Sequence, residues 1–436
     1  MLDIKRIREE TDLIKKGLST RDEGLGHIVD QILEADLERR KSLTEVENLK
    51  AKRKTVSKEI GALMGQKKHD EAEVRKAETK DLGKQISELD AKVSACEQGL
   101  EEAMLTLPNL PHSSVPIGEN ESENVTEREW GQKPNFDFDP VNHVELCDRL
   151  GLIDFNRGVK IAGSGFLLYT GWGAKLERAL IQFLLEIHTE ENSYMEVSPP
   201  YIVNRDVMYG VGQFPKFSDQ AYAVQEGEDE TTMGKYFLLP TAEAPVANIH
   251  REEILKQEQL PIQYCAYSPC FRAEAGAAGV NTRGMIRVHQ FDKVELIKIV
   301  EPENSYDELE SLLKDAEGIL QRLGLHYRVL QLCTGDMGFG SAKTFDIEVW
   351  APGQQQYLEV SSCSNCEDFQ ARRMNLRYKS KQKGNQFPHI LNGSGTALAR
   401  LFVAFIETYQ QKDGSILIPE ILQPFLKSER IPVANS

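Results

Sequence analysis

The sequence predicts an α+β fold, in which an antiparallel sheet flanked by helices follows an N-terminal antiparallel α-helical coiled-coil hairpin. Three observations predict this fold. Before residue 108, apolar residues recur in alternating steps of four and three, which is the period of a coiled-coil seam. Beyond it, strand patterns follow one another without the strand–helix–strand units of a parallel sheet. The 436 residues leave room for two or three domains, and Pro108 and Pro111 place a boundary between residues 1–110 and 111–436.

The hairpin is predicted over a stretch without proline, from about residue 28 to residue 107. Its second half carries an unbroken seam, made by Leu82, Ile86, Leu89, Val93, Cys96, Leu100, Ala103 and Leu107. Its first half has the same rhythm with one cation in the seam, in the order Leu49, Arg53, Val56, Ile60 and Leu63. The segment Gly65–Asp70 lies between the two halves and is suited to a turn, so we expect two antiparallel helices.

Charge is distributed unevenly along the chain. The formal net charge is −16, so a nucleic acid would have to meet a local basic patch. Residues 50–68 contain seven Lys and Arg against one acid, Glu59. The cations that we consider for RNA contact are Lys50, Lys52, Arg53, Lys54 and Lys58. From the residues alone, an RNA contact, a solvated coiled coil and an arm for a protein partner all stay open.

Cysteine usage and apolar runs indicate a cytoplasmic protein without a membrane partner. The first residues lack the positive, apolar and small-residue order of a signal peptide, and runs such as 401–406 are too short to span a bilayer. Seven cysteines, an odd number, argue against a disulfide framework. Cys363-x-x-Cys366 lacks a second pair at zinc spacing, so we interpret both as structural thiols.

The stretch from Pro269 to Glu295 organises the rest of the chain. It predicts two strands joined by a long loop that contains Gly276, Gly279, Gly284 and one cation, Arg283. In the second strand a period of two places on one face Met285, Arg287, His289, Phe291, Lys293 and Glu295. The opposite face, suited to a core, has Ile286, Val288, Val294 and Leu296. We expect the first face to meet a polar ligand, with a solvated surface as the alternative.

Two elements before this stretch carry further signals. An amphipathic helix around residues 176–187 leads to a strand that ends at Pro199-Pro200, which is typical of an edge strand. This helix is consistent with a subunit contact or with an internal core. A short apolar strand at 236–239 is followed by Thr241 and Glu243, and Glu243 together with Glu295 could hold a cationic amine.

The C-terminal part predicts a nucleotide site without a glycine-rich phosphate loop. Asn392-Gly-Ser394-Gly is expected to open a helix over 396–409 that is apolar nearly all round except for Arg400. A guanidinium there must be paired, either with a structural carboxylate or with a phosphate or purine. Arg272 is interpreted as an anion clamp. Glu359 and Ser362 offer hard oxygens to Mg²⁺, which an ATP site needs between its phosphates.

These residues also carry a resemblance to a known family. Phe271-Arg272-x-Glu274, Thr282-Arg-Gly284 and Phe291-Asp-Lys-Val-Glu295 resemble motif 2 of the class II aminoacyl-tRNA synthetases, and Asn392-Gly-Ser-Gly with Ala399-Arg400 resembles motif 3. The helix that ends at Pro200 is similar to motif 1, the dimer motif. The blocks that narrow the resemblance to the seryl-tRNA synthetases are Thr241–Glu243, Cys333–Gly340, Ser361–Asn365 and Asp368–Arg373. The similarity covers essentially the whole chain.

The resemblance implies ATP-dependent ligation of L-serine to tRNA-Ser through a seryl-adenylate, with tRNA-Sec as a possible second RNA, by a homodimer. It implies catalytic roles for Arg272, Glu295 and Arg400. It implies that serine is bound by Thr241, Ala242, Glu243, Arg272, Glu295, Asn392 and Ser394. It implies that ATP is bound by Arg272, Ala273, Glu274, Val288, Phe291, Glu359, Val360, Ser361, Ser362 and Arg400. Mg²⁺ would be held by Glu359 and Ser362, and the hairpin would grip the tRNA.

The resemblance also implies specific contacts for individual residues. Phe291 and Arg400 would sandwich the adenine, and Arg272 would bridge the serine carboxylate and the ATP α-phosphate. The chain departs from the family at Ala273, where Ser is frequent, and at Val280-Asn281, where Arg-Asp is common. Two rivals remain: a threonyl- or prolyl-type synthetase, and a catalytically silent homologue that binds RNA or a protein.

Overall fold

The computed structural model describes residues 1–227, 231, 234–274 and 284–433. The expected features of the long loop, namely Gly276, Gly279, Arg283 and the Val280-Asn281 departure, lie outside the described residues. The chain divides into two compact units, residues 2–107 and residues 108–436 together with Met1.

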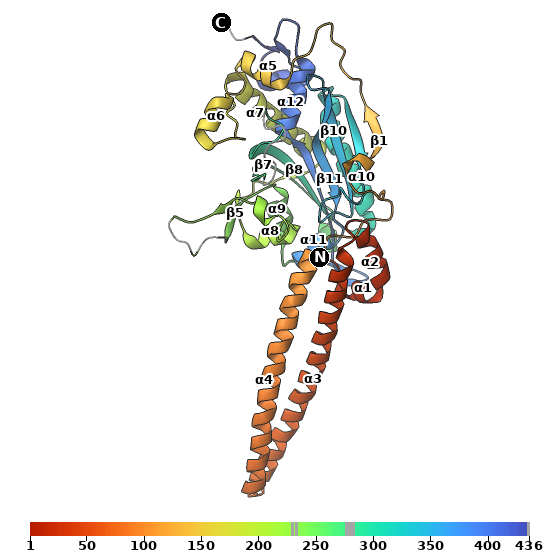
Figure 1. Ribbon diagram of the computed structural model, residues 1–436, viewed down its shortest axis with the longest axis vertical. Coiled ribbons are helices and arrows are strands. Elements are labelled where there is room, and N and C mark those ends of the chain that lie inside the picture. Colours follow the sequence, from red (N-terminus) through yellow and green to blue (C-terminus); the bar gives the residue numbers. More distant parts are fainter. Residues whose placement is uncertain (228–230, 232–233, 275–283, 434–436) are drawn as a thin grey trace. The chain divides into compact units, whose positions relative to one another are not determined.

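The first unit is a helical hairpin, as the seam predicts. Its helices are α1 (Ile4–Glu9), α2 (Thr11–Ser19), α3 (Leu25–Gly65) and α4 (His69–Thr106). The long helices α3 and α4 run side by side (Figure 1), and Val56, Leu82, Ile86 and Val93 are buried between them. The expected cation in the seam faces the partner helix: the Arg53 side chain is exposed and lies over Gly83 of α4, where no side chain competes for the space.

The second unit is built on a large sheet. Among the described residues its strands are, in sheet order, β1 (Val125–Trp130), β9 (Tyr327–Gln331), β10 (Lys343–Ala351), β11 (Gln356–Asn365), β14 (His389–Ala397), β8 (Gln290–Val300), β7 (Ile262–Phe271) and β2 (Met195–Glu196). Every neighbouring pair is antiparallel except β2 with β7. The predicted α+β class with a mostly antiparallel sheet is therefore confirmed.

Helices pack against both faces of this sheet. The helices of the second unit are α5 (His143–Leu150), α6 (Phe155–Ala162), α7 (Gly171–Glu186), α8 (Arg205–Val211), α9 (Glu243–Ala247), α10 (Ser305–Arg322), α11 (Phe369–Arg373), α12 (Leu398–Tyr409) and α13 (Gln423–Leu426). On one face α7, α10 and α12 form the larger core, which includes Val294 and Leu296 of β8. On the other face α8 and α9 form a second core with Ile297 and Ile299. The alternation along β8 thus divides its side chains between two layers.

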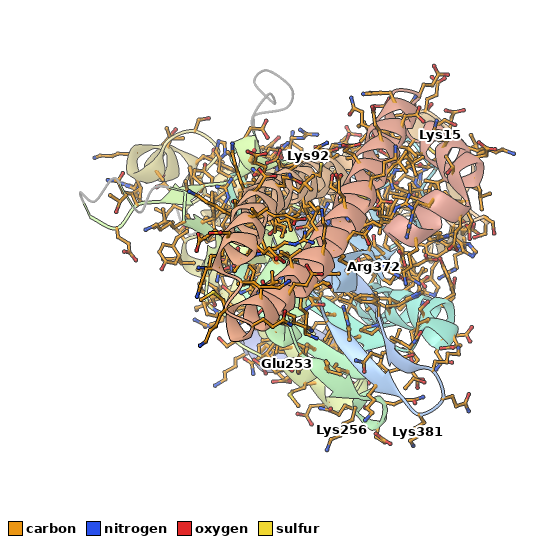
Figure 2. All side chains as sticks on the ribbon, turned by 90° about the horizontal axis from the view of Figure 1, so that it is seen from below. Lys15, Lys92, Glu253, Lys256, Arg372 and Lys381 are labelled. Carbon is orange, nitrogen blue, oxygen red and sulfur yellow. The ribbon has the colours of Figure 1, made fainter. Side chains whose placement is uncertain are left out.

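Smaller sheets complete the unit. Their strands are β3 (Ile202–Asn204), β4 (Ala223–Val224) and β5 (Tyr236–Leu238) in one sheet, β6 (Ile254–Lys256), β12 (Arg377–Ser380) and β13 (Gly384–Gln386) in another, and β15 (Ile416–Leu417) with β16 (Arg430–Ile431). Lys256 at the end of β6 and Lys381 just after β12 project from the same edge of their sheet (Figure 2). The Lys381 ammonium lies 2.9 Å from the Glu258 carboxylate, so this edge is partly neutralised.

Two expectations about local structure are wrong. Residues 285–289 do not continue the strand, because β8 begins at Gln290 opposite Phe271. Their faces are consequently not those of a strand: Met285 is fully buried in the core, whereas Val288 lines the cavity described below. Asn392-Gly-Ser394-Gly does not open a helix but lies within β14, and α12 begins only at Leu398.

The end strand β2 is short, and exposed apolar side chains lie on it and on β3. Met195 of β2 and Ile202 of β3 expose 63% and 52% of their surface, which fits the edge strand predicted from Pro199-Pro200. Within the described residues no helix is both long and apolar enough to cross a membrane. All seven cysteines are free thiols.

Candidate active site

One cavity of about 490 Å³ opens on the face of the sheet that carries the second core, a size typical of small-molecule sites. The expected site residues that line it are Thr241, Glu243, Arg272, Glu274, Val288, Phe291, Glu295, Glu359, Val360, Ser362, Asn392, Ser394 and Arg400. Ala242, Ala273 and Ser361 are not part of the lining. Ala242 and Ser361 are buried behind it, and the Ser361 hydroxyl donates a hydrogen bond to the Ser394 carbonyl.

Two glycines explain how β14 presents its polar side chains. A Cβ at Gly393 would meet Leu312 at 2.9 Å, and a Cβ at Gly395 would meet the His188 ring at 2.7 Å. The strand therefore packs closely on one side, and its period of two turns Asn392 and Ser394 toward the cavity. Ser394 is directly opposite Glu295 of β8 in the sheet register.

Arg272 lies at the end of β7 and faces Phe291 of β8. Its guanidinium carbon is 5.2 Å from the centroid of the Phe291 ring, within the range of a cation–π contact. Its Nε donates to the Pro240 carbonyl at 3.4 Å, and the backbone N–H donates to the His289 carbonyl at 2.9 Å. These contacts fix the base of the side chain and leave the rest of the fork in the cavity lining.

Arg400, in the first turn of α12, joins three segments of the cavity wall. Its Nη1 lies 3.0 Å from the Glu359 carbonyl oxygen and 3.1 Å from the Glu359 carboxylate. Its Nε donates to the Ile286 carbonyl at 3.2 Å. The cation of this apolar helix is therefore paired with a carboxylate, as its position requires, and its side chain remains 28% exposed.

At the other end of the cavity Thr241, Lys293 and Glu295 form a closed hydrogen-bonded cluster. The Lys293 ammonium lies against the Glu295 carboxylate and donates to the Thr241 hydroxyl at 2.8 Å. That hydroxyl donates to Glu295 Oε2, also at 2.8 Å. All three side chains are buried, so the ion pair is shielded from water, and its geometry is set by β8 and the turn before α9.

Glu243 is a second, half-buried carboxylate beside this cluster. Its Oε1 accepts hydrogen bonds from the Gln370 amide at 2.7 Å and the Asn392 amide at 3.1 Å. Burial, and next the nearby charge of Glu295, raise the pKa of Glu243 to about 7, against the lowering influence of Gln370, Lys293 and Arg272. Near neutral pH this carboxyl group can thus change its charge when a cation arrives.

The oxygens of Glu359 and Ser362 on β11 suit a hard divalent cation such as Mg²⁺. Asp346 on β10 is the cross-strand neighbour of Ser362, and its Oδ1 is buried without a hydrogen-bond partner. Burial, and next the charge of Glu359, hold the pKa of Asp346 well above its usual range. Within the described residues no group of three His, Cys, Asp or Glu side chains could hold a metal ion alone, so a cation here would need oxygens from its ligand as well.

Lys293 and Gln370 were not among the site residues expected from the sequence, yet both line the cavity and bond to its carboxylates. The alternation along 285–295 did place Lys293 on the polar face, but nothing distinguished it from a surface cation. Gln370 gave no signal because its partner is distant in the chain.

The five expected RNA-contacting cations all lie on α3. Lys50, Arg53, Lys54 and Lys58 line one shallow groove of that helix together with Ser57. Lys50 and Lys52 pair across the hairpin with Asp90 and Glu78, at 3.1 and 3.2 Å. Among the described residues Arg53, Lys54 and Lys58 have no carboxylate within ion-pair distance.

Comparison with known proteins agrees with this architecture. The profile described as "tRNA synthetase class II core domain (G, H, P, S and T)" matches residues 222–409, a range that contains every expected cavity residue. The fold and the cavity are therefore those of a class II aminoacyl-tRNA synthetase. The profile described as "Seryl-tRNA synthetase N-terminal domain" matches residues 1–111.

Full-length relatives define the family more narrowly. The serine–tRNA ligase of Carboxydothermus hydrogenoformans is 51% identical over 99% of each chain. The crystal structure of seryl-tRNA synthetase from Pyrococcus horikoshii, complexed with ATP, superposes with a TM-score of 0.92 at 37% identity over 100% of both chains. The cytoplasmic serine–tRNA ligase from Naegleria fowleri, in complex with AMP, gives 0.86 at 28% identity, covering 100% of this chain and 99% of that one. The chain belongs to the seryl-tRNA synthetase family and is an enzyme.

Proposed function

We propose that this enzyme charges tRNA-Ser with L-serine for protein synthesis, using ATP and passing through a seryl-adenylate. The observation that carries the proposal is that Arg272, Phe291, Glu295 and Arg400, from three separate parts of the chain, line one cavity. The names of the full-length relatives support serine and tRNA as substrates.

The ATP end of the cavity is the end at Arg400. Adenine stacks between the Phe291 ring and the Arg400 guanidinium, with the Val288 backbone at its edge, and Glu274 and Val360 complete the nucleotide contacts. Ala273 and Ser361 support this wall from just outside the lining. The Pyrococcus horikoshii neighbour, which was solved with ATP, supports nucleotide binding in this fold. When the nucleotide binds, the Arg400 guanidinium either leaves the Glu359 carboxylate or contacts that carboxylate and the nucleotide together.

Glu359 and Ser362 hold Mg²⁺ in this scheme. The ion neutralises phosphate charge when it is bound. The oxygen-only donor set at β11, with the unpartnered Asp346 Oδ1 behind Ser362, supports this assignment. The protein supplies few ligands, and Mg²⁺ normally takes its remaining oxygens from phosphates and water.

Serine binds at the other end of the cavity. Its ammonium lies between Glu243 and Glu295, and its hydroxyl meets Ser394 and Asn392, with Thr241 fixing Glu295 from behind and Ala242 buried beneath the turn. Buried polar partners for the hydroxyl reject alanine, because alanine would leave them without hydrogen bonds.

The chemistry needs positioning and charge neutralisation. A serine carboxylate oxygen attacks the α-phosphorus in line, the bond to the bridging oxygen breaks, and pyrophosphate leaves. Arg272 holds the carboxylate and the α-phosphate together and balances the charge that develops. A terminal ribose hydroxyl of the tRNA then attacks the acyl carbon, and AMP leaves.

In this proposal one unit binds the tRNA and the other catalyses the reaction. Residues 1–110 act as the tRNA-binding arm, with Lys50, Lys52, Arg53, Lys54 and Lys58 contacting the RNA backbone, and residues 111–436 form the catalytic domain. tRNA-Sec is a second RNA that the same arm would take. The exposed cations Arg53, Lys54 and Lys58, which are not neutralised within α3 and α4, support a phosphate contact.

The enzyme works as a cytoplasmic homodimer in this proposal. Two exposed apolar residues, Met195 of β2 and Ile202 of β3, support a subunit contact in this part of the chain.

Serine-dependent exchange of pyrophosphate into ATP tests the proposal. We expect exchange with serine and Mg²⁺ and none above background with threonine, alanine or proline. A folded sample that supports no exchange with any of the four would point to the silent homologue, and exchange with threonine or proline instead would identify a rival specificity.

A further inference from the structure

The serine end of the cavity contains more charge than one amino acid can use. Glu295 is a buried carboxylate, Glu243 is a half-buried carboxylate beside it, and Lys293 is a buried ammonium on the same strand as Glu295. An isolated charge in such a site is costly, so each needs a partner of opposite sign. The serine ammonium can satisfy one carboxylate, and something else must balance the other.

The charges of Lys293 and Glu295 fix which groups of this cluster donate hydrogen bonds and which accept them. An ammonium only donates and an ionised carboxylate only accepts. The Thr241 hydroxyl must therefore accept from Lys293 and donate to Glu295, as the two 2.8 Å contacts require. The Glu243 backbone N–H also donates to the Thr241 oxygen, at 3.2 Å. Both contacts to Glu295 use Oε2, and among the described residues Oε1 has no hydrogen-bond partner, so it stays available to a ligand.

The charges of the cavity residues match those of a bound amino acid. Arg272 lies toward the phosphate side and is matched by the carboxylate of the substrate. Glu243, Glu295 and Lys293 together carry one net negative charge when both carboxyl groups are ionised. That single charge equals the single positive charge of an α-ammonium group.

We propose that Lys293 is a positioning residue that sets the net charge of the amine subsite, so that one α-ammonium group neutralises it. The inference rests on the proposed function and names the group that makes the site selective for an amine. Lys293 acts through Thr241 and Glu295 and does not touch the substrate.

A second buried lysine on the same strand provides a matched control. Lys298 of β8 is 1% exposed and donates to Glu308 and Ser311, at 2.8 and 3.1 Å. It does not line the cavity. Replacing Lys298 removes a buried ammonium from β8 without changing the charge of the amine subsite.

The test is Lys293→Met against Lys298→Met, with serine titrated calorimetrically in two buffers of different ionisation enthalpy. The charged groups that act on Glu243 are Glu295, Lys293 and Arg272, and loss of Lys293 raises the pKa of Glu243 further. If that pKa rises by about one unit, serine binds about fivefold more weakly at pH 7 and recovers toward about pH 9. Proton release on binding at pH 7 rises from about 0.5 to about 0.9.

Lys298→Met is expected to keep the wild-type proton release and pH profile. Lys293→Gln, which removes the charge but can still donate to Thr241, is the second variant if Lys293→Met does not fold, and it should show the same shift. Unchanged proton release and an unchanged pH profile in a folded Lys293 variant would overturn the inference. If wild-type protein binds no serine and supports no serine-dependent exchange, the proposed function itself fails, which is a different outcome.

Discussion

The Arg400 guanidinium and the Glu359 carboxylate face each other between α12 and β11, with Nη1 3.1 Å from Oε2. The same nitrogen also reaches the Glu359 carbonyl oxygen at 3.0 Å. In the proposed function these two side chains serve the adenine and the metal ion. The pair therefore orients both side chains in the ligand-free cavity, and ATP binding has to rearrange it.

The first prediction concerns the shape of the Arg400 side chain. Arg400→Lys retains the charge but loses the planar fork that can both stack on a purine and bond to Glu359. We expect the KM for ATP to rise by about 10- to 30-fold with little change in kcat, because a desolvated stacked cation is worth up to about 2 kcal/mol of binding. Arg328→Lys, at a cation that pairs with Glu348 outside the cavity, is the control. An Arg400→Lys enzyme with an unchanged KM for ATP would contradict the stacking role.

The second prediction is a conflict between stability and activity at Glu243. The folded protein raises the pKa of this half-buried group from 4.5 to about 7, so the folded state keeps the proton while the unfolded chain loses it. Stability is then full below about pH 4.5 and falls as the pH rises through 7. At pH 8 we expect the free energy of unfolding of Glu243→Gln to exceed that of wild type by up to about 3 kcal/mol. We also expect this variant to bind no serine.

Urea unfolding at pH 5 and pH 8 measures this effect. The gain should nearly vanish at pH 5, where the wild-type group is protonated in the folded state. Glu429→Gln, at an exposed glutamate, is the control and should show no pH-dependent gain. A Glu243→Gln variant that is less stable than wild type at pH 8 would mean that the carboxylate is compensated within the fold.

Sequence patterns predicted the elements that have a regular period. The hairpin seam and the alternation at Phe291 and Glu295 follow from repeats of 3.5 and two residues, the edge strand follows from Pro199-Pro200, and the structure contains all three. The expected cavity residues came from short sequence motifs. These motifs are recognisable because the strands of the sheet dictate the spacing of their glycines and cations.

Tertiary packing decided what the patterns missed. Residues 285–289 read as strand, but the Met285 N–H donates to the His143 ring, a partner 142 residues earlier, so the segment leaves the sheet. The Asn392–Gly395 segment read as a helix start, yet close packing of Gly395 on His188 keeps it in β14. Lys293 and Gln370 were missed for the same reason, since their partners are set by the fold and not by nearby sequence.

The third prediction concerns the buried Glu407, which α12 places against the start of α5 and the turn between β10 and β11. Its Oε1 accepts from the His143 backbone at 2.7 Å and faces His143 Nδ1 at 3.2 Å, and its Oε2 accepts from the Gly353 backbone at 2.9 Å. Glu407→Ala leaves these donors buried without partners, which costs about 3–5 kcal/mol. We expect a matching loss in urea unfolding. Glu420→Ala, at an exposed glutamate in the turn before α13, should cost far less. If both variants lost the same free energy of unfolding, the hydrogen bonds of Glu407 would not stabilise the fold as proposed.

The fourth prediction tests the subunit contact. Ile202→Asp replaces an exposed apolar side chain of β3 by a charge, and desolvating that charge in the proposed subunit contact would weaken association. We expect light scattering to show a shift from dimer toward monomer at micromolar concentration. Ile117→Asp, at a residue that is 76% exposed next to the β9 end of the sheet, should leave the dimer intact. Wild-type protein that is monomeric throughout would contradict the homodimer.

The fifth prediction separates the arm from the chemistry. Lys52, Arg53 and Lys54 are exposed on α3 and lie outside the catalytic unit. Replacing all three by alanine removes up to three phosphate contacts, each of which lowers the salt slope of binding by about one. We therefore expect tRNA charging to fall and its salt dependence to weaken, with serine-dependent pyrophosphate exchange unchanged. Lys76, Lys80 and Lys84, three cations of α4, form the matched control triple, which should charge tRNA normally. Equal loss of charging and exchange in the α3 triple would mean that these residues support the fold and do not contact the RNA.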